Sequence, residues 1–314
     1  MNRLQRIDIT SLQDPALEPY MQCNETQLKH YYEPHGGVFL AESPQVICRA
    51  LDAGYEPVSF LCEEIFLEKV RDLLENHCTA NHCTANPSNA SPCTASPSPA
   101  SPGEENPLPG EGGSMQAKDG IPVYTAPLPV LTKITGYHLT KGMLCLMKRK
   151  ELPAAEDLVR GARRIAVLER VTNPTNIGAI FRSAAALGMD CVLLSADCCD
   201  PLYRRAVRVS VGMIFQVPWT ILPSSVWPDS GLSFLKKNGF CSVSLALVDD
   251  AVPIDDARLS AKEKIALILG NEGFGLCPET IQKSDYRAII PISEGVDSLN
   301  VAAASAVAFW QLRK

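Results

Sequence analysis

The segment Asn173-Pro-Thr-Asn-Ile-Gly-Ala-Ile-Phe-Arg182 decides the fold of this 314-residue chain, together with two segments that follow it. The second is Leu269-Gly-Asn-Glu-Gly-Phe-Gly275, and the third is Ile290-Pro-Ile-Ser-Glu-Gly-Val-Asp-Ser-Leu-Asn300. Each joins the end of an apolar strand to the beginning of a helix through Gly, Asn or Ser. Open α/β sheets place their ligand sites at such strand ends. The three segments therefore predict a ligand site built from several strand ends.

The sequence around these segments alternates regularly between short apolar stretches and helical ones. Strands are expected at 165–168, 191–194, 215–217, 240–245, 265–269 and 288–290. Helices are expected near 177–187, 201–209, 230–238, 277–283 and 299–312. Short strands rich in Val, Ile and Leu are typical of a parallel sheet covered on both faces. The pattern alone predicts an open, doubly wound α/β domain over residues 150–314.

The first half of the chain predicts a second, smaller α/β domain, residues 1–149. Strands are expected at 38–41, 58–62 and 123–124, and helices at 44–53 and 65–74. This alternation favours a small parallel or mixed sheet.

Residues 76–120 interrupt that domain. Asn76-His-Cys-Thr-Ala80 repeats immediately as Asn81-His-Cys-Thr-Ala85, and a stretch rich in Pro, Ser and Gly follows. Such a segment buries too little apolar surface to offset its ordering entropy, so a disordered insert is expected. The His and Cys pairs of the repeat could instead be read as a metal site, but a tandem sequence expansion is favoured.

Composition limits the class of protein. Apolar residues make up 46% of the chain, yet no uncharged apolar stretch reaches the length of about 18 residues that a membrane span needs. The first residues lack a signal-peptide pattern, so a cytoplasmic location is expected. The 12 cysteines include no CxxC pair and several lie in apolar segments, which favours reduced thiols over disulfides or a metal site. The net charge is −6, but the acidic excess lies wholly in residues 1–149, so local basic clusters are the better guide to partners.

In order and wording, the three quoted segments resemble the motifs of SpoU/TrmH-type RNA ribose methyltransferases, members of the SPOUT superfamily. The resemblance covers about residues 160–314. It implies a trefoil-knotted methyltransferase domain, S-adenosylmethionine as cofactor, RNA as substrate and a homodimer, without metal. Phe39-Leu-Ala-Glu-Ser-Pro44 and Gly136-Tyr-His-Leu-Thr-Lys141 add a weaker likeness to the family's N-terminal RNA-binding domain, which is similar to a small ribosomal protein.

The resemblance also implies roles for individual residues. As catalytic residues it gives Arg182, Asn176, Glu272, Ser298 and Asn300. As cofactor-binding residues it gives Leu269, Gly270, Gly273, Ile290 and Leu299. A separate basic cluster offers phosphate contacts through Arg204, Arg205 and Arg208.

Plainer interpretations accompany these roles. Asn176 and Ser298 could be simple helix caps, and helical arginines are commonly only solvated. Many family members have Ser where this chain has Ala302, two residues after the third segment. A guanidinium, with a pKa above about 12, is a poor general base, so Arg182 either takes the proton or, more easily, stabilises the emerging alkoxide.

The sequence thus predicts methyl transfer to a ribose 2′-hydroxyl of RNA, with ribosomal RNA favoured over transfer RNA. The alternative is a non-catalytic RNA-binding or ribosome-assembly protein with the same fold. A nicotinamide-dependent oxidoreductase is disfavoured because no GxGxxG fingerprint is present.

Overall fold

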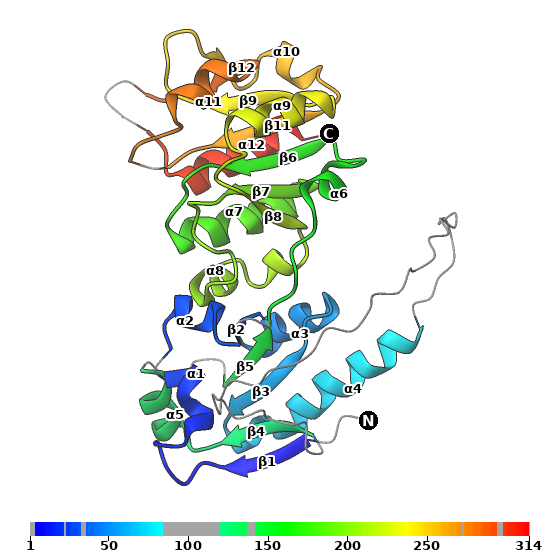
Figure 1. Cartoon of the computed structure of the whole chain (residues 1–314), viewed down its shortest axis with the longest axis vertical. Coiled ribbons are helices and arrows are strands. Elements are labelled where there is room, and N and C mark those ends of the chain that lie inside the picture. Colours follow the sequence, from blue (N-terminus) through cyan, green and yellow to red (C-terminus); the bar gives the residue numbers. More distant parts are fainter. Residues whose placement is uncertain are drawn as a thin grey trace, which may run out of the picture.

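In the part of the chain that the structure describes, two β-sheets are stacked along the long axis of the molecule (Figure 1). The computed structural model describes residues 4–21, 23–32, 36–83, 120–136, 142–271, 273–293 and 298–313, with backbone only for 76–83. One sheet lies within residues 4–148 and the other within residues 164–289. No helix in these ranges is long and apolar enough to cross a membrane.

The N-terminal sheet is mixed and has the strand order β1-β4-β3-β5-β2. Its strands are β1 (Leu4–Asp8), β2 (Val38–Glu42), β3 (Pro57–Cys62), β4 (Ile121–Thr125) and β5 (Met143–Lys148). Strand β5 runs antiparallel to β2 and β3, whereas β4 runs parallel to β1 and β3. On one face lie α3 (Pro44–Asp52) and α4 (Leu67–Cys83), and on the other α1 (Glu18–Met21), α2 (Glu25–Lys29) and α5 (Leu128–Thr135).

The C-terminal sheet is entirely parallel in its pairings and has the order β10-β12-β9-β11-β6-β7-β8. Its strands are β6 (Arg164–Leu168), β7 (Cys191–Ser195), β8 (Trp219–Leu222), β9 (Cys241–Leu245), β10 (Val252–Pro253), β11 (Ile265–Leu269) and β12 (Tyr286–Ile289). Both faces are covered, as the near-continuous apolar strands require. On one side lie α7 (Pro174–Ala186), α8 (Arg204–Val209), α10 (Ala257–Ser260) and α12 (Val301–Leu312), and on the other α6 (Ala155–Val159), α9 (Asp229–Lys237) and α11 (Pro278–Lys283).

The order of the central strands positions the site. Strand β11 enters between β6 and β9, although both precede it in the chain, and β12 then pairs with the other side of β9. The carboxyl ends of β9, β11 and β12 therefore lie side by side. The prediction of a mostly parallel α/β sheet covered by helices is confirmed.

The structure differs from the local predictions in three places. The strand expected at 215–217 is instead the end of a short 3-10 helix (Met213–Phe215), because the left-handed residues Val211 and Gly212 turn the chain and the strand begins only at Trp219. Strands β1, β5 and β10 were not predicted from the sequence. Helix α4 continues to Cys83, beyond the expected start of the insert at residue 76, and residues 84–119 of that segment lie outside the described residues.

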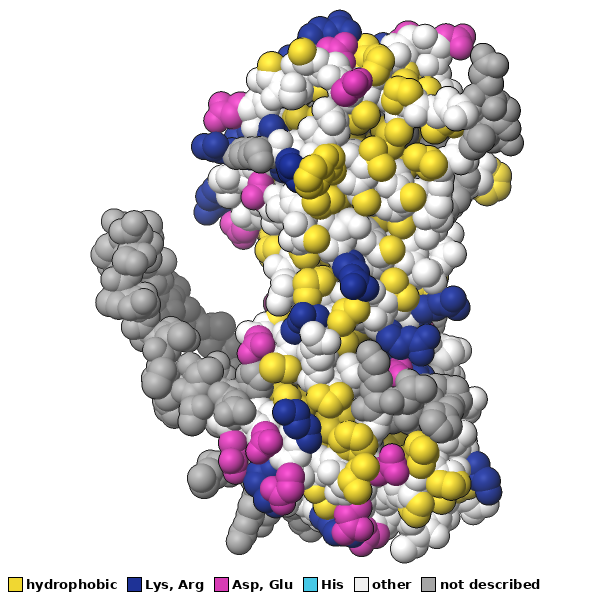
Figure 2. All heavy atoms as spheres, turned by 180° about the vertical axis from the view of Figure 1, so that it is seen from behind, with side chains coloured by type: hydrophobic (Ala, Val, Ile, Leu, Met, Phe, Trp, Pro, Cys, Tyr) yellow, Lys and Arg dark blue, Asp and Glu magenta, His cyan; other side chains and the backbone are white. Residues whose placement is uncertain are grey.

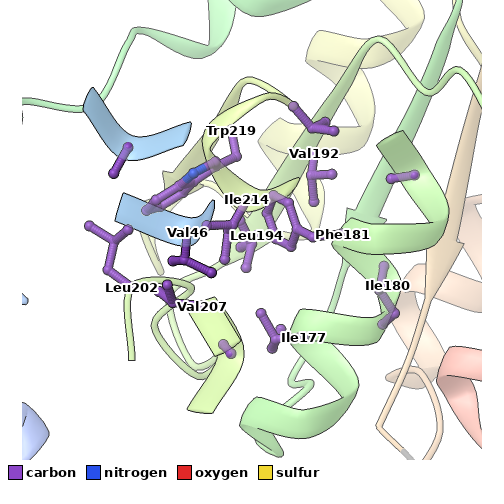
Figure 3. Close-up of a cluster of buried hydrophobic side chains, with 14 of the residues drawn as sticks. Val46, Ile177, Ile180, Phe181, Val192, Leu194, Leu202, Val207, Ile214 and Trp219 are labelled. Atoms are coloured by element: carbon purple, nitrogen blue, oxygen red, sulfur yellow. The ribbon is translucent and has the colours of Figure 1, made fainter. Parts of the chain in front are cut away.

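The two halves share one apolar core. Figure 3 shows Val46 of α3 among side chains of the C-terminal half, including Ile214 and Trp219. The ring of Phe215 lies 5.7 Å from that of Phe39 and 5.1 Å from that of Tyr55. The contact surface between the halves is thus packed like an interior, which fixes the position of the first half relative to the second.

Candidate functional site

A pocket of about 410 Å³ opens at the carboxyl ends of β9, β11 and β12. Its walls are apolar side chains of these strand ends and peptide groups of a glycine-rich loop. Volume and lining are those of a small-molecule or cofactor site. All five residues predicted to bind a cofactor line this pocket: Leu269, Gly270, Gly273, Ile290 and Leu299. Ser298, predicted as catalytic, lines it too.

The loop after β11 is closed on itself. The backbone of Asn271 exchanges hydrogen bonds of 3.1 and 2.9 Å with that of Gly275, whose φ of +65° is the left-handed conformation that glycine adopts readily. The Asn271 side chain accepts from the peptide N–H groups of Gly273 and Phe274, and it donates to the carbonyl of Arg170 over 2.9 Å. The pocket wall is therefore a fixed turn.

Glycine is required at position 270 because the backbone of Gly275 and Leu276 passes close to it. A Cβ at this position would lie 2.5 Å from the carbonyl carbon of Gly275 and 2.6 Å from the nitrogen of Leu276. Because both neighbours are backbone, neither can rotate away. The turn thus needs glycine on steric grounds before any ligand is considered.

The helices of the first and third segments meet at their N-termini. Asn300 caps α12 by accepting from the N–H of Ala302 at 3.0 Å, and its Nδ2 donates to Oδ1 of Asn176 at 3.2 Å. Asn176 is 6% exposed and lies inside α7, because Pro174 begins the helix and Asn173 caps it. Asn176 and Ser298 are therefore not the helix caps. Both caps are asparagines, at positions 173 and 300.

Arg182 lies on the exposed side of α7 and does not line the pocket of its own chain. Within the part of the chain that the structure describes, its guanidinium has no hydrogen-bond or ion-pair partner. The structure brings Asn176 and Asn300 together but does not place Arg182 beside the pocket. Glu272 lies outside the described residues.

The basic cluster of α8 lies where the two halves meet. The guanidinium of Arg204 forms an ion pair of 3.2 Å with the buried carboxylate of Glu42, and the backbone N–H of Arg204 donates to the Glu25 side chain at 2.8 Å. Burial lowers the pKa of the Arg204 guanidinium and raises that of the Glu25 carboxyl. Arg208 is 3.8 Å from Glu42 and more exposed, whereas Arg205 is exposed. Arg204 thus serves the contact between the halves, and the other two face solvent.

Several pocket residues were missed from the sequence. They include Leu245 at the end of β9, the residues Ala246, Leu247 and Val248 that follow it, and Asn271 and Phe274 of the loop. The signal was present, since β9 was expected to end at 245 and strand ends form the site. In the described ranges no three His, Cys, Asp or Glu side chains gather in an arrangement that could hold a metal ion.

Comparison with known proteins places the C-terminal half in one family. The model of the SpoU rRNA methylase family matches residues 163–310. An uncharacterized tRNA/rRNA methyltransferase of Mycobacterium bovis is 42% identical over 193 residues, which is 61% of this chain and 66% of the relative. The 23S rRNA (guanosine(2553)-2′-O)-methyltransferase of Bacillus subtilis is 30% identical, with 60% of this chain and 76% of the relative covered.

Solved structures extend the likeness to the whole fold. An rRNA methyltransferase from Sinorhizobium meliloti, solved with AdoMet bound, has a TM-score of 0.70 and 19% identity, and the match covers 98% of this chain and 97% of that one. The methyltransferase AviRb from Streptomyces viridochromogenes, solved in complex with AdoMet, has a TM-score of 0.66 and 19% identity over 94% of this chain and 95% of that one. At these identities the comparison establishes a shared two-sheet fold.

Proposed function

The chain belongs to the SpoU rRNA methylase family, and we propose that it transfers a methyl group from S-adenosylmethionine to a ribose 2′-hydroxyl of RNA. The observation that carries the proposal is the pocket: all five residues expected to hold the cofactor line one cavity at three adjacent strand ends. Relatives that are 23S rRNA methyltransferases favour ribosomal over transfer RNA as the substrate.

The pocket suits the cofactor chemically. Leu269, Ile290 and Leu299 offer apolar walls for a purine, and Gly270 and Gly273 leave peptide groups accessible for polar contacts. When bound, the cofactor supplies an electrophilic methyl group on a sulfonium. The chain's own task is then to hold the acceptor oxygen in line with that methyl group and to stabilise the charge it develops.

We assign the stabilisation of that charge to Arg182. Its guanidinium is a fork of fixed donors that can hold a phosphate or the emerging alkoxide. Since it has no partner within the described residues, no internal ion pair must break before it meets RNA. The hydrogen bond between Asn300 and Asn176 holds the N-termini of α12 and α7 together. We assign both asparagines, with Ser298 and Glu272, to the catalytic group.

A second copy of the chain would complete the site. Helix α12 exposes Val307 (43%) and Trp310 (56%), and Leu299 just before it is 41% exposed. Figure 2 shows exposed hydrophobic side chains over the C-terminal half. Large apolar groups on one helix face indicate a covered surface. Because α12 packs on α7, a homodimer formed through this face would lie beside the helix that carries Arg182.

RNA would approach near the junction of the two halves. Figure 2 shows Lys and Arg side chains around the narrow middle of the molecule. Arg205 and Arg208 of α8 are exposed there and fit phosphate contacts, which position RNA without reading its sequence. Of the three arginines predicted for this role, Arg204 contributes least because Glu42 and Glu25 already hold it.

The remaining expectations are part of the same proposal. Residues 1–149 form an RNA-binding domain resembling a small ribosomal protein, and residues 150–314 form the methyltransferase domain. The insertion of β11 between two earlier strands, followed by the return of α12 to α7, supports a trefoil knot at the pocket. The proposal also keeps the cytoplasmic location expected from the sequence.

Nucleoside analysis tests the proposal. The protein is incubated with S-adenosylmethionine and ribosomal RNA, which is then digested to nucleosides. A new 2′-O-methylated nucleoside is the expected product. Methylated bases would contradict the ribose assignment, and tight RNA binding without any methylated product would favour the non-catalytic alternative.

A further inference from the structure

Glu169 is a buried carboxylate directly after β6, and its contacts reach the pocket loop. It is 1% exposed. Its Oε1 accepts from the N–H of Cys277 at 2.5 Å, and its Oε2 accepts from Trp227 Nε1 at 2.7 Å and from Thr280 Oγ1 at 2.5 Å. Within the described residues it has no Lys or Arg partner, so neutral donors alone hold this buried acid.

Two of these donors belong to the segment that leaves the pocket loop. Cys277 follows the pocket residue Leu276, and Thr280 lies in α11. Arg170, the residue after Glu169, holds the start of the same loop, because its backbone carbonyl accepts a hydrogen bond of 2.9 Å from the Asn271 side chain. Arg170 has a φ of +57°, a conformation that a non-glycine residue keeps only when its surroundings impose it. Two consecutive residues thus hold the loop at both ends.

From this geometry we propose that Glu169 is a positioning residue for the cofactor: together with the Arg170 carbonyl it clamps the Gly270–Leu276 loop in the shape that binds S-adenosylmethionine. The inference rests on the proposed function, because the loop matters for catalysis only if the pocket holds that cofactor. Glu169 itself does not line the pocket. Even with three donors, burial of a carboxylate without a cationic partner costs free energy, so a purely structural position would be better served by an apolar side chain.

The test uses two variants that remove different bonds. In Glu169→Gln the amide oxygen stays where Trp227 and Thr280 both donate. The amide nitrogen then faces the N–H of Cys277, so the hydrogen bond from Cys277 is lost and the one from Thr280 is kept. Trp227→Phe removes the indole donor and leaves both bonds from the loop side intact. The two full-length proteins are compared with wild type by calorimetric titration with S-adenosylmethionine and by hydrogen exchange of the 270–277 peptide without cofactor.

We expect Glu169→Gln to weaken cofactor binding at least tenfold, with kcat at saturating cofactor within threefold of wild type, and to accelerate exchange in the 270–277 peptide. Trp227→Phe should lower the melting temperature while cofactor binding stays within twofold. Equal cofactor affinity of Glu169→Gln and wild type, or equal losses in both variants, would overturn the clamp. Absence of cofactor binding by the wild type would instead overturn the proposed function, while the exchange experiment would still show whether Glu169 holds the loop.

Discussion

The Nδ2 of Asn300 donates to the Oδ1 of Asn176 over 3.2 Å and so joins the N-termini of α12 and α7. The two residues are 124 positions apart, and each belongs to one of the segments singled out from the sequence. Asn300 also caps its own helix. One side chain therefore both begins α12 and fixes it to the helix that carries Arg182.

The two roles of Asn300 can be separated by substitution. Asn300→Ala loses both, and the missing cap should cost about 1 kcal/mol of stability. Asn300→Ser keeps an oxygen for the cap but is too short to reach Asn176, so it loses only the hydrogen bond between the helices and should be destabilised less than Asn300→Ala. Both variants should lose methyl transfer by about tenfold, the scale of one hydrogen bond at a site. Urea denaturation and initial rates measure this, and full activity of Asn300→Ser would show that the contact with Asn176 is dispensable.

Arg182→Ala should abolish most transfer without unfolding the protein. Because the side chain is exposed and unpaired within the described residues, we expect a stability change within about 0.5 kcal/mol. Methyl transfer should fall at least ~100-fold, the scale of a lost electrostatic catalytic group, with cofactor affinity unchanged. Arg160, which follows the C-terminus of α6, is another exposed arginine, and Arg160→Ala is the control. An active Arg182→Ala enzyme would refute the role of this residue.

Gly270→Ala should damage the pocket through a clash of its Cβ with the backbone of Gly275 and Leu276, at 2.5 and 2.6 Å. Overpacking of this kind costs about 1–3 kcal/mol. The shifted loop should also lose cofactor affinity. Gly273→Ala is the control within the same loop, since its Cβ would meet nothing nearer than 3.5 Å, at Asn271 Oδ1. Thermal denaturation should separate the two variants, and an equal loss of stability in both would contradict the steric argument.

Arg205→Ala should weaken RNA binding with little dependence on RNA sequence. The removal of one phosphate contact lowers the slope of log affinity against log salt by about 0.7–0.9. Lys237→Ala, on the opposite side of the C-terminal sheet, removes the same charge from an exposed position and should leave the slope unchanged. Filter binding at several salt concentrations measures both, and equal slopes for the two variants would place the RNA elsewhere.

The sequence predicted the pocket better than it predicted the contacts around it. Leu269, Gly270 and Ile290 were found because their segments resemble family motifs, whereas the local pattern of an apolar strand and a turn indicates only a strand end. The strand at Trp219 was misplaced because the turn at Val211 and Gly212 depends on a left-handed non-glycine residue, which no local pattern announces.

Long-range pairing was beyond the reach of the sequence. The ion pair of Arg204 with Glu42 joins residues 162 positions apart, so an arginine expected to meet RNA is held by the other half of the chain. Glu169 was equally invisible, since only the folded chain brings Cys277 and Thr280 to it. Neither contact can be predicted from the spacing or the periodicity of residues in the sequence.

Transfer of labelled methyl from S-adenosylmethionine to total RNA from a host lacking this protein tests the central claim most directly. The labelled RNA is isolated, and the modified nucleotide is mapped. We predict label on a ribose 2′-oxygen of ribosomal RNA with the wild-type protein. An unlabelled RNA pool, with RNA binding retained, would contradict an enzymatic function and leave the assembly-factor alternative.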